Sequence, residues 1–135
     1  MVKTMSTNNK LPIIYDLNSI PVLNESASLK KCLDLMSKLG KGISVLVDND
    51  NKIQGVLTDG DLRRLLLTHQ NPLPSLLISE GIKFGSKNPV VFKETVDREE
   101  IVETIMQKHI SQILIVDHNN KFIGYVNGYD LIKSE

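Results

Sequence analysis

The chain contains the same pattern of residues twice, over residues 22–62 and 91–131. Gly55 and Gly124 stand 69 positions apart (124 − 55 = 69). The polar residues around them keep the same step without a gap, as shown by the pairs Asp48 and Asp117, Lys52 and Lys121, and Asp61 and Asp130. Repetition of this kind marks two copies of one supersecondary unit. We therefore expect two equivalent halves.

A helix opens the first copy. Apolar residues recur at helical spacing over residues 27–36, and the hydroxyl of Ser26 or Ser28 is placed to cap the helix start. We expect this helix to end near Gly40, since glycine commonly follows a helix.

The second copy repeats this helix over residues 96–106. Thr95 or Asp97 is the expected cap, and acidic residues follow in the first turn, where the helix dipole favours them. His109 stands where the first copy has Gly40, and an imidazolium there interacts favourably with the dipole.

Strands and turns follow each helix. The short apolar runs 43–47 and 113–116 are rich in β-branched residues and favour buried strands. Asn and Asp clusters predict hairpin turns at 48–52 and 117–121, with returning strands at 53–57 and 122–126. Second helices are expected near 59–61 and 128–130, and extended stretches at 19–22 and 88–91. Each copy therefore reads β-α-β-β-α, a mixed α/β (α+β) fold.

The expected organisation has four parts: a disordered segment over residues 1–16, a first repeat over 17–69, a connector over 70–84 and a second repeat over 85–135. The connector carries two prolines and a short helical turn near Leu76 and Leu77.

Composition narrows the function classes. A chain of 135 residues, 41% of them hydrophobic, is long enough for one compact module and too short for a catalytic domain besides. Sixteen basic and sixteen acidic residues cancel, which argues against nucleic acid as a partner. There is no apolar run that would cross a membrane and no signal-peptide core. The single Cys32 is compatible with a reducing compartment. We expect a cytoplasmic protein without membrane contact.

The chemistry is concentrated at Thr58 and Asp61. A hydroxyl at the end of a strand, followed three residues on by a carboxylate at a helix start, places both near free backbone N–H groups. This arrangement suits a phosphate and a sugar. The same two residues also match a capping box, in which they satisfy only the helix start. Capping leaves other N–H donors available, so both interpretations stay open.

From residue 55 to residue 64, the sequence Gly-Val-Leu-Thr-Asp-Gly-Asp-Leu-Arg-Arg follows a strand, a helix and a hairpin. This order resembles the cystathionine-β-synthase (CBS) domain, which usually occurs in tandem pairs called Bateman modules. The resemblance covers about residues 17–135. The run Thr-Asp-Gly-Asp-Leu-Arg-Arg is similar to the CBS pairs attached to arabinose-5-phosphate isomerases, of the sugar-phosphate isomerase family, and to pairs preceding some sugar nucleotidyltransferases.

The resemblance implies a nucleotide site. Thr58 would contact the phosphate and Asp61 the two ribose hydroxyls, while the base would rest against Ile20, Pro21 and Val22. The implied ligands are AMP, ADP or ATP, or a CMP-linked sugar, and no cofactor is required. The resemblance also implies that the two repeats pack with pseudo-twofold symmetry and leave two equivalent clefts.

The second copy departs from this motif. Asn127 replaces Thr58, and Tyr129 stands where it would crowd the cleft, while the aspartate persists as Asp130. Asn127 and Asp130 are the candidate contacts of a second site, and we expect the first copy to hold the better one.

Positive charge for a phosphate comes from Arg63 and Arg64. One of them is expected to face solvent or to pair with an acid of the module, so that at most one touches ligand. We expect no metal site, because the paired aspartates lack the calcium-loop spacing, and no catalytic residues, because Cys32 lies on an apolar helix face.

The sequence therefore predicts a regulatory nucleotide-binding module and not an enzyme. Its partners would be a nucleotide, a catalytic domain in cis or in trans, and a second copy in a homodimer. The helical faces expected to supply part of that dimer carry Leu33, Met36, Ile105 and Met106. Two alternatives are a ligand-free dimerisation scaffold of a larger enzyme and a truncated isomerase or nucleotidyltransferase that keeps activity. The absence of a phosphosugar-binding domain argues against the latter.

Overall fold

The structure is a computed structural model that describes residues 3–4, 13–14 and 17–133. Two short strands, β1 (Lys3–Thr4) and β2 (Ile13–Ile14), pair in antiparallel fashion. The rest of the segment predicted to be disordered, residues 1–16, lies outside the described residues.

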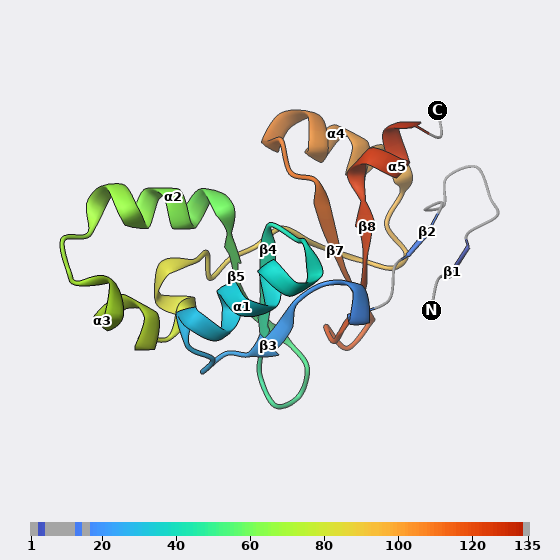
Figure 1. The fold of residues 1–135 in the computed structure, drawn as a ribbon. Helices are drawn as coiled ribbons and strands as arrows, with labels where there is room; N and C mark the ends of the chain where they lie inside the picture. The colour runs from blue at the N-terminus through green and yellow to red at the C-terminus, as the bar shows by residue number, and fades with distance from the viewer. Residues whose placement is uncertain (1–2, 5–12, 15–16, 134–135) are drawn as a thin grey trace. The chain divides into compact units, whose positions relative to one another are not determined.

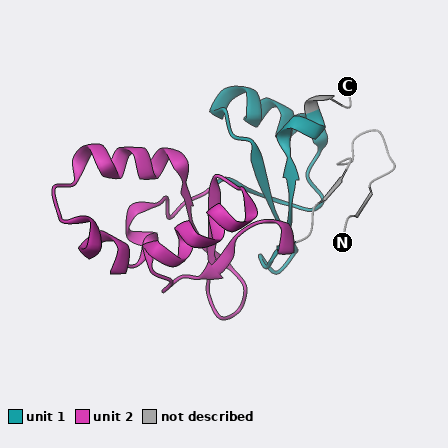
Figure 2. Ribbon diagram, in the orientation of Figure 1, with its two compact units in different colours: residues 1–17, 90–135 teal, residues 18–89 magenta. Residues whose placement is uncertain are grey.

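The chain divides into two compact units, coloured separately in Figure 2. We call residues 18–89 the first unit, which is magenta and keyed as unit 2 in Figure 2. We call residues 1–17 and 90–135 the second unit, which is teal and keyed as unit 1. Each unit contains one copy of the repeat, so we describe them in turn.

The first unit is a three-stranded sheet with helices (Figure 1). Its strands lie in the order β3-β4-β5, with β3 parallel to β4 and β4 antiparallel to β5. In chain order the elements are η1 (Leu17–Ser19), β3 (Val22–Asn24), α1 (Leu29–Leu39), β4 (Ile43–Val47), β5 (Ile53–Thr58), α2 (Asp59–Thr68), α3 (Leu73–Ile78) and η2 (Gly81–Phe84).

Local sequence explains the bounds of α1. The hydroxyl oxygen of Ser28 accepts a hydrogen bond from the backbone N–H of Lys31 at 3.2 Å, which selects Ser28 over Ser26 as the cap. Gly40 ends the helix in the left-handed conformation, φ 65°, that glycine adopts at little cost. The predicted start and end of this helix are confirmed.

One hydrophobic core joins the helices of the first unit to one face of its sheet. Its buried members are Leu29, Cys32, Leu46, Leu57, Leu65 and Leu76, which come from α1, β4, β5, α2 and α3. Burial raises the pKa of the Cys32 thiol. The prediction that Cys32 is a core residue is confirmed.

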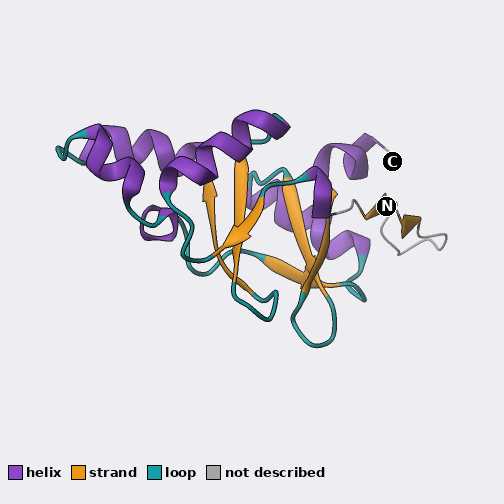
Figure 3. Cartoon of the chain, turned by 60° about the horizontal axis from the view of Figure 1, so that its bottom comes forward, coloured by secondary structure: helices purple, strands orange, loops and turns teal. Residues whose placement is uncertain are grey.

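The second unit repeats this plan. Its sheet has the order β6-β7-β8, and β2 lies beside β8. In chain order the elements are β6 (Val91–Lys93), α4 (Arg98–Lys108), β7 (Gln112–Val116), β8 (Phe122–Asn127) and α5 (Gly128–Lys133). Its core consists of Ile101, Ile105, Ile113, Ile115, Val126 and Leu131. Figure 3 separates helices from strands in both units.

The two hairpin turns are copies of each other. The Asp48 carboxylate accepts hydrogen bonds from the N–H groups of Asp50 and Lys52 at 2.8 and 3.0 Å, and Asp117 accepts the corresponding two at the same distances. In both antiparallel hairpins the strand pairing shifts register just before the turn, between Leu46 and Val47 and between Ile115 and Val116. The predicted mixed α/β fold of two β-α-β-β-α copies is confirmed, and their pseudo-twofold packing stays a prediction.

The predicted starts of the first strands were wrong. The strands β3 and β6 begin three residues later than the predicted 19–22 and 88–91. In the first copy, residues 17–19 form a 3-10 turn and Pro21 has no N–H to donate.

Other details were predicted in part. Asp97 is the residue at the N-cap of α4, one of the two predicted caps, but its side chain makes no capping bond. The predicted helical turn near Leu76 is confirmed as α3, whereas the 3-10 helix η2 was not predicted.

The helical faces expected to supply a dimer interface also need correction. Met36 is 5% exposed and Ile105 is 8% exposed, so both are buried within the chain, Ile105 in the core of the second unit. Leu33 is half-buried against the first core, and only Met106 of the four is exposed.

Residues 85–86, which directly follow the connector, close the outer edge of the first sheet. The N–H of Val56 donates to the carbonyl of Ser86, and the N–H of Ser86 donates to the carbonyl of Val56, both at 2.9 Å. Gly85 permits this approach, because a Cβ there would lie 2.1 Å from the Val56 oxygen.

Candidate functional site

The candidate residues of the first copy gather at one end of its sheet. Thr58, the last residue of β5, pairs with Ile43, the first residue of β4. On the other side of β4, Val22 pairs with Val45, and the Pro21 carbonyl accepts a hydrogen bond from the Val45 N–H at 2.8 Å. The strand β4 therefore lies between the segment expected to hold a base and the segment expected to hold a phosphate and a ribose.

The three residues expected to hold the base differ in exposure. Ile20 is 2% exposed and Pro21 is buried, whereas Val22 is half-buried. In the conformation described, the side chain of Val22 is therefore the most accessible of the three to a ligand.

Thr58 and Asp61 form a complete capping box at the start of α2. The Asp61 carboxylate accepts hydrogen bonds through Oδ2 from the Thr58 N–H at 2.8 Å and from the Thr58 hydroxyl at 3.0 Å. The Asp61 N–H in turn donates to the Thr58 hydroxyl oxygen at 3.3 Å. The capping interpretation is confirmed, and binding by the same residues stays a prediction.

Arg64 occupies the other oxygen of the Asp61 carboxylate. Its Nη2 lies 2.5 Å from Asp61 Oδ1, and the two side chains are 64% and 12% exposed, respectively. The expectation that one of the two arginines pairs with an acid of the module is confirmed for Arg64. Arg63 is exposed, as predicted for an arginine that faces solvent.

Two guanidinium groups and one hydroxyl lie near Gly60, the second residue of α2. A Cβ on Gly60 would lie 3.5 Å from Arg64 Nη1, 3.6 Å from the Thr58 hydroxyl oxygen and 3.8 Å from Arg63 Nη2, which are ordinary contact distances. Space alone therefore does not require a glycine here. The sequence interpretation did not single out Gly60.

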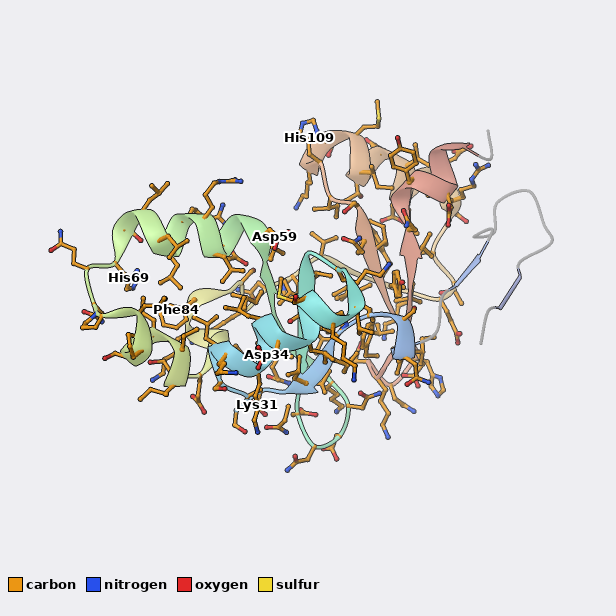
Figure 4. The ribbon with its side chains drawn as sticks, in the orientation of Figure 1. Lys31, Asp34, Asp59, His69, Phe84 and His109 are labelled. Carbon is orange, nitrogen blue, oxygen red and sulfur yellow. The ribbon has the colours of Figure 1, made fainter. Side chains whose placement is uncertain are left out.

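A second unforeseen glycine is Gly42. The N–H of Asp59 donates to the Gly42 carbonyl at 3.0 Å, and a Cβ on Gly42 would lie 2.6 Å from Asp59 Oδ2. Figure 4 labels Asp59 at the start of α2. Gly42 thus lets the first residue of α2 approach the beginning of β4, which fixes where the helix starts.

The second copy has a different helix start. The Asn127 side-chain oxygen accepts a hydrogen bond from the Tyr129 N–H at 2.9 Å, whereas Thr58 bonds to Asp61. Gly128 donates to the Ser111 carbonyl at 2.7 Å, as Asp59 does to Gly42. Tyr129 is 73% exposed and Asp130 is half-buried. The prediction of a weaker second site remains a prediction.

A separate surface depression lies between β3 and α1, with a volume of about 520 Å³. It is lined by Val22, Leu23, Asn24, Ser26, Ala27, Ser28, Lys31 and Leu35. Val22 is its only member among the candidate residues, so it is distinct from the start of α2. Figure 4 shows Lys31 and Asp34 on α1.

The described part of the chain offers neither a cluster of metal ligands nor a membrane-spanning helix. No group of three or more His, Cys, Asp or Glu residues in that part is arranged to hold a metal ion. Among residues 3–4, 13–14 and 17–133, none of the helices combines the length and the apolar character that crossing a bilayer requires.

A family model decides which family this repeat belongs to. The model for the CBS domain matches residues 4–68 and 82–135, one stretch for each copy. The chain belongs to the CBS domain family. The predicted tandem pair is therefore confirmed.

Curated relatives of this CBS pair include enzymes. The arabinose 5-phosphate isomerase KdsD of Francisella tularensis subsp. tularensis is 30% identical over 122 residues, which cover 87% of this chain and 35% of the isomerase. The chain spans about a third of the length of the curated relatives it matches. The predicted similarity to arabinose-5-phosphate isomerases is confirmed.

Solved structures share the fold of the CBS pair. CBSX2 in complex with AMP has a TM-score of 0.75 and 17% identity, over 90% of each chain. The cytosolic domain of the Mg²⁺ channel MgtE in complex with ATP has a TM-score of 0.70 and 16% identity, over 87% of this chain and 45% of that one. At these identities the likeness concerns the fold alone.

Proposed function

We propose that this chain is a regulatory nucleotide-binding CBS pair. It would sense an adenine nucleotide or a cytidine-linked sugar and control a sugar-phosphate enzyme, in cis or in trans, without catalytic activity of its own. The observation that carries the proposal is the start of α2, where Thr58 and Asp61 bond to each other and Arg64 pairs with Asp61. Arg63 lies near Gly60 in the same helical turn, and the same sheet end holds residues 20–22.

The roles of the residues follow from this placement. The N–H groups and the Thr58 hydroxyl would bind phosphate together with Arg63 or Arg64, while Asp61 would accept bonds from the ribose hydroxyls. Residues 20–22 would support the base. Asn127 and Asp130 would form a second and weaker site.

Adenine nucleotides are supported by the solved relatives in complex with AMP and with ATP. A sugar-phosphate enzyme as the controlled partner is supported by the curated isomerase KdsD, of which the CBS pair matches 35%. A cytidine-linked sugar is the alternative ligand, as a feedback signal from the same pathway. We propose a cytoplasmic homodimer in which the two repeats pack with pseudo-twofold symmetry.

A ligand-free dimerisation scaffold is the second candidate function. One observation favours it: Thr58 and Asp61 already satisfy each other, so the helix start is complete without a ligand. In this case the residues of the motif would serve only the stability of α2.

Isothermal titration of the chain with AMP, ATP, CMP and a CMP-linked sugar separates the two functions. We expect saturable binding of at least one ligand, weakened at least tenfold in Asp61→Asn, because a lost charge-assisted hydrogen bond is worth about 1.5–3 kcal/mol. Asp59→Asn is the matched control, since it removes the same charge from the same helical turn and leaves the bonds between Thr58 and Asp61 in place. No heat from any ligand, for a folded chain, would favour the scaffold.

A further inference from the structure

The ribose-binding carboxylate of the proposed site is covered by a side chain of the same helix. Asp61 Oδ2 accepts two hydrogen bonds from Thr58, and Asp61 Oδ1 accepts one from Arg64. Because the Asp61 side chain is only 12% exposed, Arg64 stands where an incoming ribose hydroxyl would approach Oδ1. Ribose and Arg64 would therefore compete for the same oxygen.

The Thr58 hydroxyl is also engaged in the ligand-free chain. A hydroxyl has one proton to donate, and that of Thr58 is directed at Asp61 Oδ2. The hydroxyl cannot donate to a phosphate in this state, so the phosphate must first be bound by another group. The guanidinium groups of Arg63 and Arg64, which lie close to Gly60, are placed for that contact.

We infer that Arg64 is a displaceable cover on Asp61 that makes the site select phosphorylated ligands over nucleosides. The inference rests on the proposed function. A phosphate at the start of α2 draws the guanidinium from Asp61 onto itself, since arginine binds phosphate through two parallel hydrogen bonds. The freed Oδ1 then accepts a ribose hydroxyl. A nucleoside has no phosphate, so it would have to break the ion pair between Arg64 and Asp61 without offering Arg64 a new partner.

The environment of Arg64 is consistent with a cover that can move. The side chain is 64% exposed, and the pair has i,i+3 spacing on a helix surface, where an ion pair adds little to stability. The second copy has Ile132 and Lys133 at the positions of Arg63 and Arg64, and Asn127 in place of Thr58. The inference concerns the first copy.

Titrations with matched ligand pairs test this inference. The full chain is titrated with AMP and adenosine, and with CMP and cytidine, as wild type, as Arg64→Ala and as Arg63→Ala. For the base that binds, Arg64→Ala should weaken nucleotide binding about tenfold or more, because a charge-assisted contact is lost. The same variant should tighten nucleoside binding by about two- to fivefold, because an exposed ion pair no longer covers Asp61.

The gain in nucleoside affinity is the decisive result, since a plain phosphate contact would not produce it. Arg63→Ala is the control: it removes the neighbouring guanidinium without touching Asp61, so nucleoside affinity should stay unchanged. In an Asp61→Asn background, Arg64→Ala should no longer tighten nucleoside binding. Melting curves of all variants verify that each is folded.

The outcomes separate this inference from the proposed function. If nucleotides bind and Arg64→Ala leaves nucleoside affinity unchanged or lower, the cover is disproved and nucleotide binding stands. If Arg63→Ala gives the same gain, the effect comes from charge in general and the specific role of Arg64 is disproved. If neither nucleotides nor nucleosides bind the folded wild type, the proposed function fails and this inference fails with it.

Discussion

Gly40 and His109 occupy the same position in the two repeats and have the same left-handed backbone, with φ 65° and 54°. Glycine adopts this conformation readily, whereas a residue with a Cβ is strained by about 1–2 kcal/mol. His109 therefore ends α4 at a cost that Gly40 avoids at the end of α1.

His109→Gly should stabilise the chain by about 0.5–1 kcal/mol, because the relief of strain exceeds the additional freedom that glycine gives the unfolded chain. Gly40→Ala should lower stability by about 1 kcal/mol, since nothing lies within 4 Å of the added Cβ and the cost is conformational alone. Urea unfolding of the two variants measures both effects. A loss of stability in His109→Gly would mean that the imidazole makes a favourable contact at the helix end that outweighs the strain.

At the residue scale, the sequence was sufficient to place Thr58 and Asp61 at the start of α2, because strand, hydroxyl and carboxylate follow each other in order. Helix spacing also favours Arg64 as the partner of Asp61, because residues three apart are neighbours on a helix surface whereas Arg63 is only two residues on. The sequence interpretation named both arginines without applying this spacing. The position of Gly42 beneath Asp59 depends on tertiary contact, which the local sequence does not show.

The turns after β4 and β7 are the elements most alike in the two repeats. The pKa of the Asp48 carboxyl is lowered, and the largest cause is its hydrogen bond from the backbone N–H of Lys52. The pKa of the Asp117 carboxyl is lowered in the same way, mainly by the backbone N–H of Lys121. Asn51 and Asn120 complete the turns with positive φ, 62° and 66°, which asparagine tolerates better than most residues.

These two pKa shifts predict an acid-sensitive stability. A carboxyl whose pKa is lower in the folded state contributes stability that is complete above its unfolded pKa, about 3.9, and is lost as the pH falls through the folded value. We expect the free energy of unfolding to decrease below about pH 4. The decrease should be shallower in the double variant Asp48→Asn, Asp117→Asn, as measured by urea unfolding between neutral and acid pH. If the free energy of unfolding of the wild type and of the double variant fell equally steeply with falling pH, the prediction would be wrong.

At the element scale, the hydrophobic pattern identified α1 and α4 by their apolar faces, and β4, β5, β7 and β8 as short apolar runs. The bounds of β3 and β6 were missed because pairing depends on the neighbouring strand: Val22 and Val91 are the first residues to pair with β4 and β7, respectively. Neither partner can be read from the local sequence.

At the scale of the whole molecule, each unit has a core of its own. Leu46 and Ile115 occupy equivalent positions in β4 and β7, and both are 0% exposed. Leu46 is a member of the core of the first unit, and Ile115 is a member of the core of the second.

Leu46→Ala and Ile115→Ala should each destabilise the chain by about 2–5 kcal/mol, because each leaves a cavity in a packed core. Amide hydrogen exchange should show that Leu46→Ala lowers protection mainly in residues 18–89 and Ile115→Ala mainly in residues 90–133. The milder Ile115→Val should destabilise the chain by about 1 kcal/mol and should lower amide protection in the same residues as Ile115→Ala. Loss of protection spread equally over both units by both variants would show that they unfold as one.

The pairing of Ser86 with Val56 bears on how the protein behaves in a crowded solution. An uncovered outer strand offers its N–H and carbonyl groups to any other extended chain, which is how sheets of separate molecules join into aggregates. Two hydrogen bonds with Ser86 occupy those groups at Val56. This bridge leaves fewer edge groups open to another chain, and it depends on the close approach that Gly85 permits.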